Sequence, residues 1–197
     1  MLSSKRRYLI AGLGNPGGEY EKTRHNAGFM VLDEVAAAYA ISVSKRKFNL
    51  VYGTGTIEGV EVILAKPQSF MNRSGLPIFS LAGFYKILSK DLLIIHDDID
   101  LTIGRIKIKE KGGHGGHKGL KSIIDTCGSG DFARLRIGVG RSEAQSVTNH
   151  VLGQFSSEET RILGQALARA REAVAMFLSK GIVECMNTFN QKITISS

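Results

Sequence analysis

A histidine and an aspartate are the side chains in this sequence whose types and surroundings could carry out catalysis. His25 lies near the end of residues 12–28, GLGNPGGEYEKTRHNAG, where a helical pattern begins. Asp97 directly follows the apolar run 92–96, LLIIH. A carboxylate that binds one imidazole nitrogen fixes the tautomer of the ring and leaves the other nitrogen free to take a proton from water. The pair could therefore serve as a general base.

Spacing alone leaves a structural interpretation open for both residues. Asp97 could cap a helix or a turn, and His25 could be a surface histidine. In open α/β sheets, ligands bind just outside the carboxyl ends of the strands, and a predicted strand ends directly before Asp97. Whether the two side chains meet decides between the interpretations.

The glycines at the start of the 12–28 loop match a nucleotide-binding pattern. Gly12, Gly14 and Gly17 have the G-x-G-x-x-G spacing and follow a predicted strand. The dinucleotide fingerprint also needs a helix that opens immediately, so that its N-terminus faces the pyrophosphate. Pro16 and a run of charged residues intervene here. The glycines are better explained as a tight turn that brings Asn15 to a ligand.

The segment 112–119, GGHGGHKG, offers two histidines as candidate metal ligands. His114 and His117 are three residues apart, but no cysteine or carboxylate cluster accompanies them in the sequence. A zinc site would need further ligands to converge. A flexible glycine loop is better suited to present backbone N–H groups and cations to phosphate. The sequence therefore predicts no metal site.

Positive charge is concentrated in two segments of the chain. The formal net charge is +8, and residues 105–121 contain six Lys or Arg residues against one acid, Glu110. Residues 105–109 alternate cations with isoleucine, which predicts a half-exposed strand with a basic face. A second cluster, Lys45-Arg46-Lys47, lies in a predicted loop. Solvated lysines would explain the total charge, but its distribution favours contact with nucleic-acid phosphates.

Hydrophobic periodicity predicts a single α/β domain over residues 1–197, with a twisted, mixed and mostly parallel sheet flanked by helices. Glu58-Gly59 predicts the turn of one hairpin in the N-terminal half. Ser156 and Glu159 form a capping-box pattern, and Gly181 is the expected end of the helix that it opens. Strands are expected at 7–12, 48–57, 60–65, 92–96, 105–109 and 135–139, helices from 29 and at 76–88, 120–127 and 157–180, and a mobile loop at 141–150.

Composition excludes several classes of protein. The longest apolar runs are far shorter than the ~20 residues that a membrane helix needs. Cys127 and Cys185 have no metal-like spacing and no disulfide framework is indicated, so a reducing cytoplasm is expected. No Gly-x-Ser-x-Gly elbow or activated cysteine offers a covalent nucleophile.

Taken together, four motifs resemble those of bacterial-type peptidyl-tRNA hydrolases. They are GLGNPGGEYEKTRHNAG, KPQSFMNRSG, HDDID and GGHGGHKGL, in this order. The resemblance covers essentially the whole chain. It implies a monomeric, cofactor-free α/β esterase, without an obligate protein partner, that cleaves peptide from the tRNA of peptidyl-tRNA released by stalled ribosomes.

The resemblance also implies roles for individual residues. The family's catalytic histidine falls on His25, and its supporting aspartate falls on Asp97 rather than on Asp98. The expected substrate-binding residues are Asn15, Tyr20, Met71 and Asn72, and the expected tRNA phosphate-binding residues are Lys107, Lys109 and Arg136.

Lys118 departs from the family pattern, which usually has asparagine at this position. Asparagine both donates and accepts hydrogen bonds, whereas lysine only donates. A nearby ammonium would also lower the pKa of His25. We expect Lys118 at the substrate site, either beside His25 or turned outward to phosphate, and do not carry over the asparagine's role.

The expected reaction is attack on the ester carbonyl by a water that His25 deprotonates. The competing expectation is a non-catalytic RNA-binding protein on the same scaffold, as in a chloroplast intron-splicing relative of the family. A dinucleotide-dependent enzyme is a more distant third.

Overall fold

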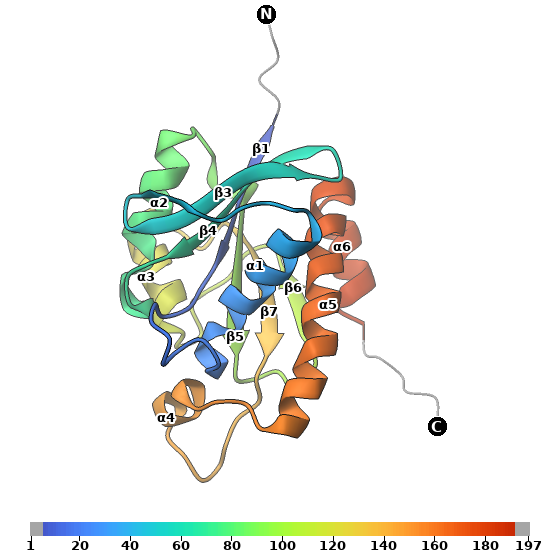
Figure 1. The fold of residues 1–197 in the computed structure, drawn as a ribbon. Coiled ribbons are helices and arrows are strands. Elements are labelled where there is room, and N and C mark those ends of the chain that lie inside the picture. The colour runs from blue at the N-terminus through green and yellow to red at the C-terminus, as the bar shows by residue number, and fades with distance from the viewer. Residues whose placement is uncertain (1–5, 192–197) are drawn as a thin grey trace, which may run out of the picture.

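The computed structural model describes residues 6–191, which fold around one sheet of seven strands (Figure 1). In spatial order the strands are β2 (Lys45–Lys47), β3 (Leu50–Ile57), β4 (Val60–Pro67), β1 (Arg7–Gly12), β5 (Leu92–Asp98), β7 (Ala133–Gly138) and β6 (Ile106–Lys109). The helices are α1 (Ala27–Ala38), α2 (Gly75–Phe84), α3 (Lys118–Cys127), α4 (Val147–Leu152), α5 (Ser157–Lys180) and α6 (Ile182–Phe189). Three short 3-10 helices are η1 (Arg24–Asn26), η2 (Met71–Arg73) and η3 (Ser89–Asp91).

The centre of the sheet is parallel and its edges are antiparallel. Strands β4, β1, β5 and β7 pair in parallel, whereas β2–β3, β3–β4 and β6–β7 are antiparallel. The predicted mixed α/β sheet is therefore confirmed, as is the β3–β4 hairpin. Its turn, Glu58-Gly59, has positive φ at both residues, as the two-residue hairpin turn requires. The carboxyl ends of the four parallel strands meet at one edge of the sheet, where α/β proteins bind ligands.

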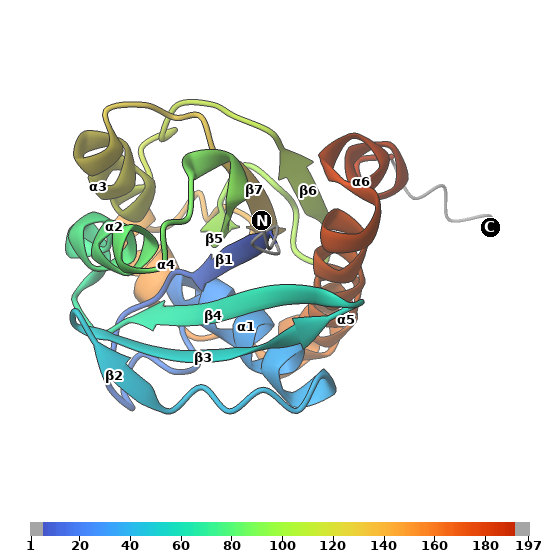
Figure 2. The same ribbon diagram turned by 90° about the horizontal axis from the view of Figure 1, so that it is seen from above.

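Helices cover both faces of the sheet because the central strands are apolar on both sides. On β1, Tyr8 and Ile10 pack in the cluster of α1, α5 and α6, whereas Leu9 and Ala11 pack in the cluster of α2 and α3. Figure 2 shows α2 and α3 on one side of the central strands and α5 and α6 on the other. This burial makes the strand ends a rigid support for the loops that follow them.

Edge strand β2 and helix α6 occur where the sequence did not predict them. Residues 45–47 form edge strand β2 rather than a loop, because they pair with residues 50–52 of β3. Helix α6 begins directly after Gly181, which ends α5 as expected with a φ of 85°. Both elements depend on tertiary contacts rather than on a local pattern.

Several predicted boundaries also differ. Helix α2 ends at Phe84 rather than at residue 88, because Lys86 has a φ of 56° that no α-helix allows. The predicted loop 141–150 is wrong in its second half, where Ser146 caps α4 by accepting from the N–H of Asn149. Helix α3 begins at Lys118, two residues earlier than expected.

The predicted capping box at the start of α5 is confirmed. Ser156 Oγ accepts from the N–H of Glu159, and the Glu159 carboxylate accepts from the N–H of Ser156. Within residues 6–191, no helix combines the length and the apolar character needed to cross a bilayer. The assignment of residues 1–197 to one domain stays a prediction.

Candidate active site

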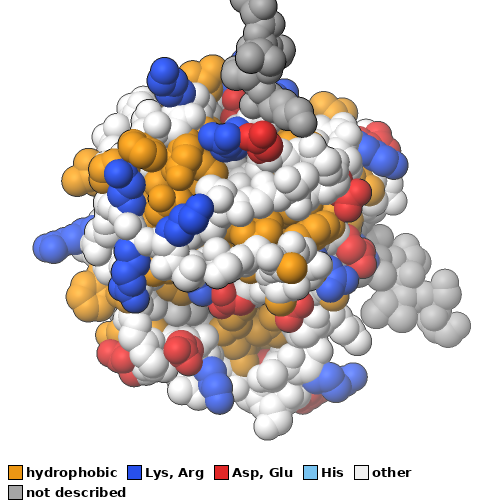
Figure 3. All heavy atoms as spheres, turned by 45° about the horizontal axis from the view of Figure 1, so that its top comes forward, with side chains coloured by type: hydrophobic (Ala, Val, Ile, Leu, Met, Phe, Trp, Pro, Cys, Tyr) orange, Lys and Arg blue, Asp and Glu red, His pale blue; other side chains and the backbone are white. Residues whose placement is uncertain are grey.

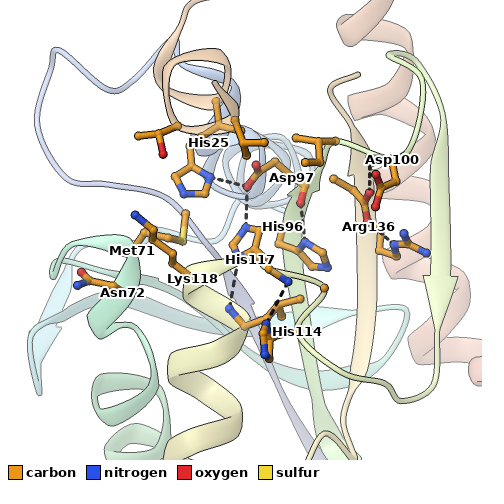
Figure 4. Close-up of a pocket in the computed structure, with 18 of the residues that line it drawn as sticks. His25, Met71, Asn72, His96, Asp97, Asp100, His114, His117, Lys118 and Arg136 are labelled. Carbon is orange, nitrogen blue, oxygen red and sulfur yellow. Dashed lines mark hydrogen bonds and ion pairs between the residues drawn. The ribbon is translucent and has the colours of Figure 1, made fainter. Parts of the chain in front are cut away.

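A cavity of about 790 Å³ opens at the carboxyl ends of the parallel strands (Figure 4). Its walls come from the loop after β1, the segment after β4, the end of β5, the start of α3 and helix α4. Nine of the ten residues that the sequence predicted for the site line this cavity, and Lys107 does not. The nine are Asn15, Tyr20, His25, Met71, Asn72, Asp97, Lys109, Lys118 and Arg136.

His25 and Asp97 meet at the base of the cavity. His25 lies on η1, and its Nδ1 is 2.9 Å from Asp97 Oδ1 at the end of β5. Both side chains are buried. Because a carboxylate only accepts, Nδ1 carries the proton and Nε2 holds the lone pair. Nε2 lies on the side of the ring away from Asp97, toward the cavity (Figure 4).

A second imidazole, that of His117, also contacts Asp97. Its Nε2 lies 2.8 Å from the same Oδ1. Its Nδ1 accepts from the N–H groups of Gly119 and Leu120 at 3.1 and 3.2 Å, so that His117 is the N-cap of α3. Since Nδ1 accepts, the proton must be on Nε2, which donates to Asp97. The sequence analysis missed this role, because histidine is not among the preferred N-cap residues.

The histidines keep the Asp97 carboxylate ionised despite its burial. Burial opposes the charge, but the interactions with His117 and His25 outweigh it and hold the pKa of Asp97 below its ordinary value. His96 behaves differently, because burial and the neighbouring His117 lower its pKa to about 3. His96 is therefore neutral at physiological pH, and its Nδ1–H donates to the Asp97 carbonyl at 2.6 Å.

His25, Asp97 and His117 are also the one group of described residues that approaches a metal-ligand arrangement. Their nitrogen–oxygen distances of 2.8 and 2.9 Å are those of hydrogen bonds. Tetrahedral zinc ligands at 2.0–2.1 Å from the ion would lie about 3.3 Å apart. His114 is not part of the group, and its Nδ1 accepts from the N–H of Gly116. Hydrogen bonding thus accounts for the cluster, and the lack of a metal site stays a prediction.

Asn15 is held in place by two other residues. Asn15 N–H donates to Asn26 Oδ1, and Asn26 Nδ2 donates to the Asn15 carbonyl, both at 2.9 Å. The Asn15 Oδ1 accepts from the N–H of Met71 at 2.8 Å. This bond assigns the orientation of the amide and leaves its NH₂ group to face the cavity that Asn15 lines. The positioning role of Asn26, which is fully buried, was not predicted.

Gly12 and Gly14 allow close packing, a role that differs from the tight turn expected from the sequence. A Cβ on Gly12 would lie 2.4 Å from the Gly28 carbonyl oxygen, and one on Gly14 would lie 2.7 Å from the Phe29 ring. Helix α1 begins only at Ala27, well after Gly17, whereas the dinucleotide fingerprint needs a helix that opens directly after its glycines. The geometry therefore gives no support to a dinucleotide site.

The predicted basic face is present on the β6–β7 edge of the sheet. Lys107 pairs with Arg136 in register, and Lys109 with Arg134. Their neighbours Ile106, Ile108, Leu135 and Ile137 point the other way, into the core. Alternation thus puts the four cations on one side, as the sequence of residues 105–109 predicted.

These four cations are not equivalent. Arg136 donates to Asp98, and the buried Arg134 binds the Gly112 and Gly113 carbonyls of the glycine loop. Among the described residues, Lys107 and Lys109 form no ion pair. The two lysines are therefore the cations of this face with charge available for a ligand.

The mouth of the cavity is partly aromatic and apolar. The Tyr20 and Phe70 rings pack edge to face, with centroids 6.4 Å apart. Lys118 is exposed at the first turn of α3. The wall formed by α4 was not predicted from the sequence; its lining residues are Val147, Thr148, Val151 and Leu152.

Comparisons with known proteins agree on one family. A family model described as peptidyl-tRNA hydrolase matches residues 9–196. The peptidyl-tRNA hydrolase of Caldanaerobacter subterraneus is 48% identical over 183 residues, which are 93% of this chain and 99% of that protein. That of Desulforudis audaxviator is 49% identical over 182 residues, 92% of each. The crystal structure of peptidyl-tRNA hydrolase from Acinetobacter baumannii matches with a TM-score of 0.89 and 40% identity, covering 93% of this chain and 94% of that one.

Proposed function

Because the chain belongs to the peptidyl-tRNA hydrolase family, we propose that it hydrolyses the ester bond between tRNA and a peptide or N-blocked aminoacyl group. This activity returns tRNA from peptidyl-tRNA that was released prematurely. The observation that supports it best is the His25–Asp97 hydrogen bond, which leaves His25 Nε2 with a lone pair beside the cavity.

The reaction begins with a proton transfer from water to His25 Nε2. Asp97 holds the Nδ1 proton and stabilises the imidazolium that forms. The water oxygen attacks the ester carbonyl to give a tetrahedral intermediate with a negative oxygen. Collapse of the intermediate breaks the bond to the terminal ribose oxygen, which takes the proton from His25 Nε2. Each step transfers a proton or an acyl group, so the proposal needs no cofactor.

Amide and apolar groups around His25 would position the substrate. The NH₂ group of Asn15, fixed by its bond from Met71, would donate to the ester carbonyl oxygen or to the peptide backbone. Asn72, exposed on η2, would bind the peptide, while Tyr20 and Met71 form apolar surface beside it. Lys118 at the cavity rim would bind phosphate or the polar end of the substrate.

The tRNA would lie along the β6–β7 edge. Among the residues that the structure describes, Lys107 and Lys109 form no ion pair, and Arg136 lies in the same row with its guanidinium bound to Asp98. Phosphate contacts of this kind position a nucleic acid without reading its sequence. The enzyme would act in the cytoplasm as a monomer, without an obligate protein partner.

A non-catalytic RNA-binding protein is the competing function. It would use the same lysines but would have no need of an imidazole that is buried, oriented and open to a cavity. The His25–Asp97–His117 arrangement therefore favours hydrolysis over binding alone.

The test is acyl release from N-acetylated aminoacyl-tRNA by the purified protein. We expect turnover that persists after treatment with a chelator, because no step uses a metal. The matched control is His25→Ala, which retains the lysine face. Binding of tRNA without acyl release by the unmodified protein would establish the non-catalytic alternative, and loss of turnover in chelator would overturn the metal-free mechanism.

A further inference from the structure

The basic cluster at residues 45–47 is not used by the proposed reaction. It lies on β2, next to two exposed aromatic residues, Phe48 and Phe84. Phe48 is 41% exposed and Phe84 is 52% exposed, and their ring centroids are 5.9 Å apart. Lys47 Nζ lies 4.1 Å from the Phe84 ring centroid and 5.1 Å from that of Phe48. Figure 3 shows a face of the molecule on which hydrophobic side chains gather among lysines and arginines. We call Lys45, Arg46, Lys47, Phe48 and Phe84 the aromatic–cationic surface.

Phe48 occupies a backbone conformation that does not suit it. Phe48 and Asn49 are the two turn residues between β2 and β3, with φ of 50° and 58°. Such turns favour Asn or Gly at both positions, and a bulky residue there is strained. Burial offsets this strain only in part, because Phe48 remains 41% exposed. A bulky residue at positive φ with a partly exposed ring is an outlier from which a function of the side chain can be proposed.

The charges of the surface are available to a ligand. Lys45 donates to Thr54 Oγ1, and within residues 6–191 none of the three cations forms an ion pair. An apolar protein partner would have to desolvate the Lys47 ammonium between the two rings. RNA satisfies both features, because its phosphates neutralise cations and its unpaired bases stack on aromatic rings.

The position of the surface separates it from the tRNA path. Strand β2 is the edge of the sheet opposite β6, and the cavity lies at the strand ends between them. The Asn49 carbonyl accepts from the N–H of Gln68, which fastens the turn to the segment that carries Met71 and Asn72. A tRNA held on β6 ends at the ester in the cavity, and the acyl group continues beyond it. An RNA bound on the β2 side would therefore be a different molecule from the tRNA in the cavity.

We propose that the aromatic–cationic surface binds a single-stranded RNA segment distinct from the tRNA whose ester is cleaved. Bases stack on Phe48 and Phe84, and phosphates contact Lys45, Arg46 and Lys47. This second RNA site is independent of catalysis, so its failure would leave the hydrolase assignment intact.

The decisive variant is Phe48→Asn, measured by the fluorescence anisotropy of a labelled, unpaired oligoribonucleotide of about ten nucleotides. Asparagine removes the ring but suits the left-handed turn, so this variant folds at least as stably as the original protein. We expect its affinity to fall about tenfold, since one stacked base contributes about 1–3 kcal/mol. Lys47→Gln is expected to weaken binding and to lower the salt slope by about 0.7.

Matched controls come from another part of the fold. Val183→Gln removes an exposed apolar side chain from α6, and Lys180→Gln removes a cation at the end of α5. Both should bind the oligoribonucleotide as the original protein does. Phe48→Asn should also release acyl groups at the original rate, and excess deacylated tRNA should leave the oligoribonucleotide bound.

Four outcomes would overturn the proposal. They are unchanged affinity in Phe48→Asn, equal affinity for duplex RNA, full displacement by tRNA, and no binding by the original protein. Displacement by tRNA would place the oligoribonucleotide in the cavity or on β6. Absence of binding would leave a protein as the partner of this surface.

Discussion

Asp97 is the residue on which the geometry of the site depends. One oxygen of its carboxylate accepts from both His25 and His117. The His117 bond is itself fixed, because the other nitrogen of that ring caps α3. The orientation of His25 is thus set by a chain of hydrogen bonds that starts at a helix N-terminus.

Substitution of His117 separates its two roles. His117→Asn preserves a good N-cap but is too short to reach Asp97, so we expect near-original thermal stability and turnover reduced about tenfold. His117→Ala loses both roles and should also lose about 1 kcal/mol of stability. Acyl-release kinetics and thermal unfolding measure the two effects. If His117→Asn kept the original turnover, Asp97 would not need its second partner.

The lowered pKa of His96 predicts that the free energy of unfolding depends on pH. Its folded pKa of about 3 lies below the ordinary 6.5, so the unfolded chain binds a proton that the folded chain does not. Stability should therefore fall as pH drops through 6.5, by about 2 kcal/mol at pH 5, and continue to fall toward pH 3. The lowered pKa of Asp97 acts only at more acid pH, below its ordinary 3.8.

Urea unfolding at pH 7 and pH 5 measures this effect. His96→Gln, which does not titrate, is the matched variant, and its stability should change less between the two pH values. An equal change in both proteins would assign the proton uptake to other groups.

Residue roles were partly accessible from the sequence. His25 and Asp97 could be proposed from the ends of predicted elements and from motif resemblance, but 72 residues separate them and only folding brings them together. His117 and Asn26 act through hydrogen bonds to backbone groups. No residue pattern in the sequence predicts such bonds.

At the scale of elements, α5 is bonded to the loop that carries His25. Arg24, beside His25, donates to both oxygens of Glu159 at 3.0 and 2.8 Å. Glu159 also completes the capping box with Ser156. Burial opposes its charge, but the Ser156 N–H and Arg24 together lower the pKa of Glu159. The first turn of α5 and the η1 turn are therefore held as one unit.

Two substitutions separate the effect of the Arg24–Glu159 ion pair from that of the Ser156 N-cap. Glu159→Gln retains a capping-box residue but loses the ion pair with Arg24, whereas Ser156→Ala loses the cap and leaves the pair. We expect Glu159→Gln to lower kcat several-fold with little change in KM, and Ser156→Ala to lower stability by about 1 kcal/mol with kcat retained. If kcat fell equally in both variants, the pair would be only structural.

The elements that the sequence predicted are those with local signals. The buried strand 92–96 and the capped helix from residue 157 have apolar runs, periodicity or a capping box. Strand β2 has only three polar residues and forms because β3 lies beside it. Helix α6 has no side-chain N-cap and forms against β6, where Asn190 bonds the Ile108 backbone.

At the scale of the whole molecule, each edge strand of the sheet carries a group of cations, residues 45–47 on β2 and Lys107 and Lys109 on β6. The mixed sheet was predictable because apolar strands alternate with helical patterns. The curl that brings three loops and α4 around one cavity was not, because it results from packing on both faces.

The β6 edge predicts how tRNA binding responds to salt. Lys107→Gln and Lys109→Gln should each weaken binding and reduce the slope of log K against log salt by about 0.7–0.9. Binding titrations across a salt series measure the slope, with Lys180→Gln as the control. An unchanged slope would exclude the substituted lysine from the phosphate contacts.

The central claim is that His25, oriented by Asp97, activates the attacking water. The most direct test is acyl release by His25→Ala under single-turnover conditions, with tRNA affinity measured on the same protein. General-base catalysis predicts a rate loss of about 10²–10⁴-fold. The tRNA affinity should be nearly unchanged, because His25→Ala retains Lys107, Lys109 and Arg136, the cations proposed to contact phosphate. Ester cleavage by His25→Ala at the original rate would contradict the mechanism.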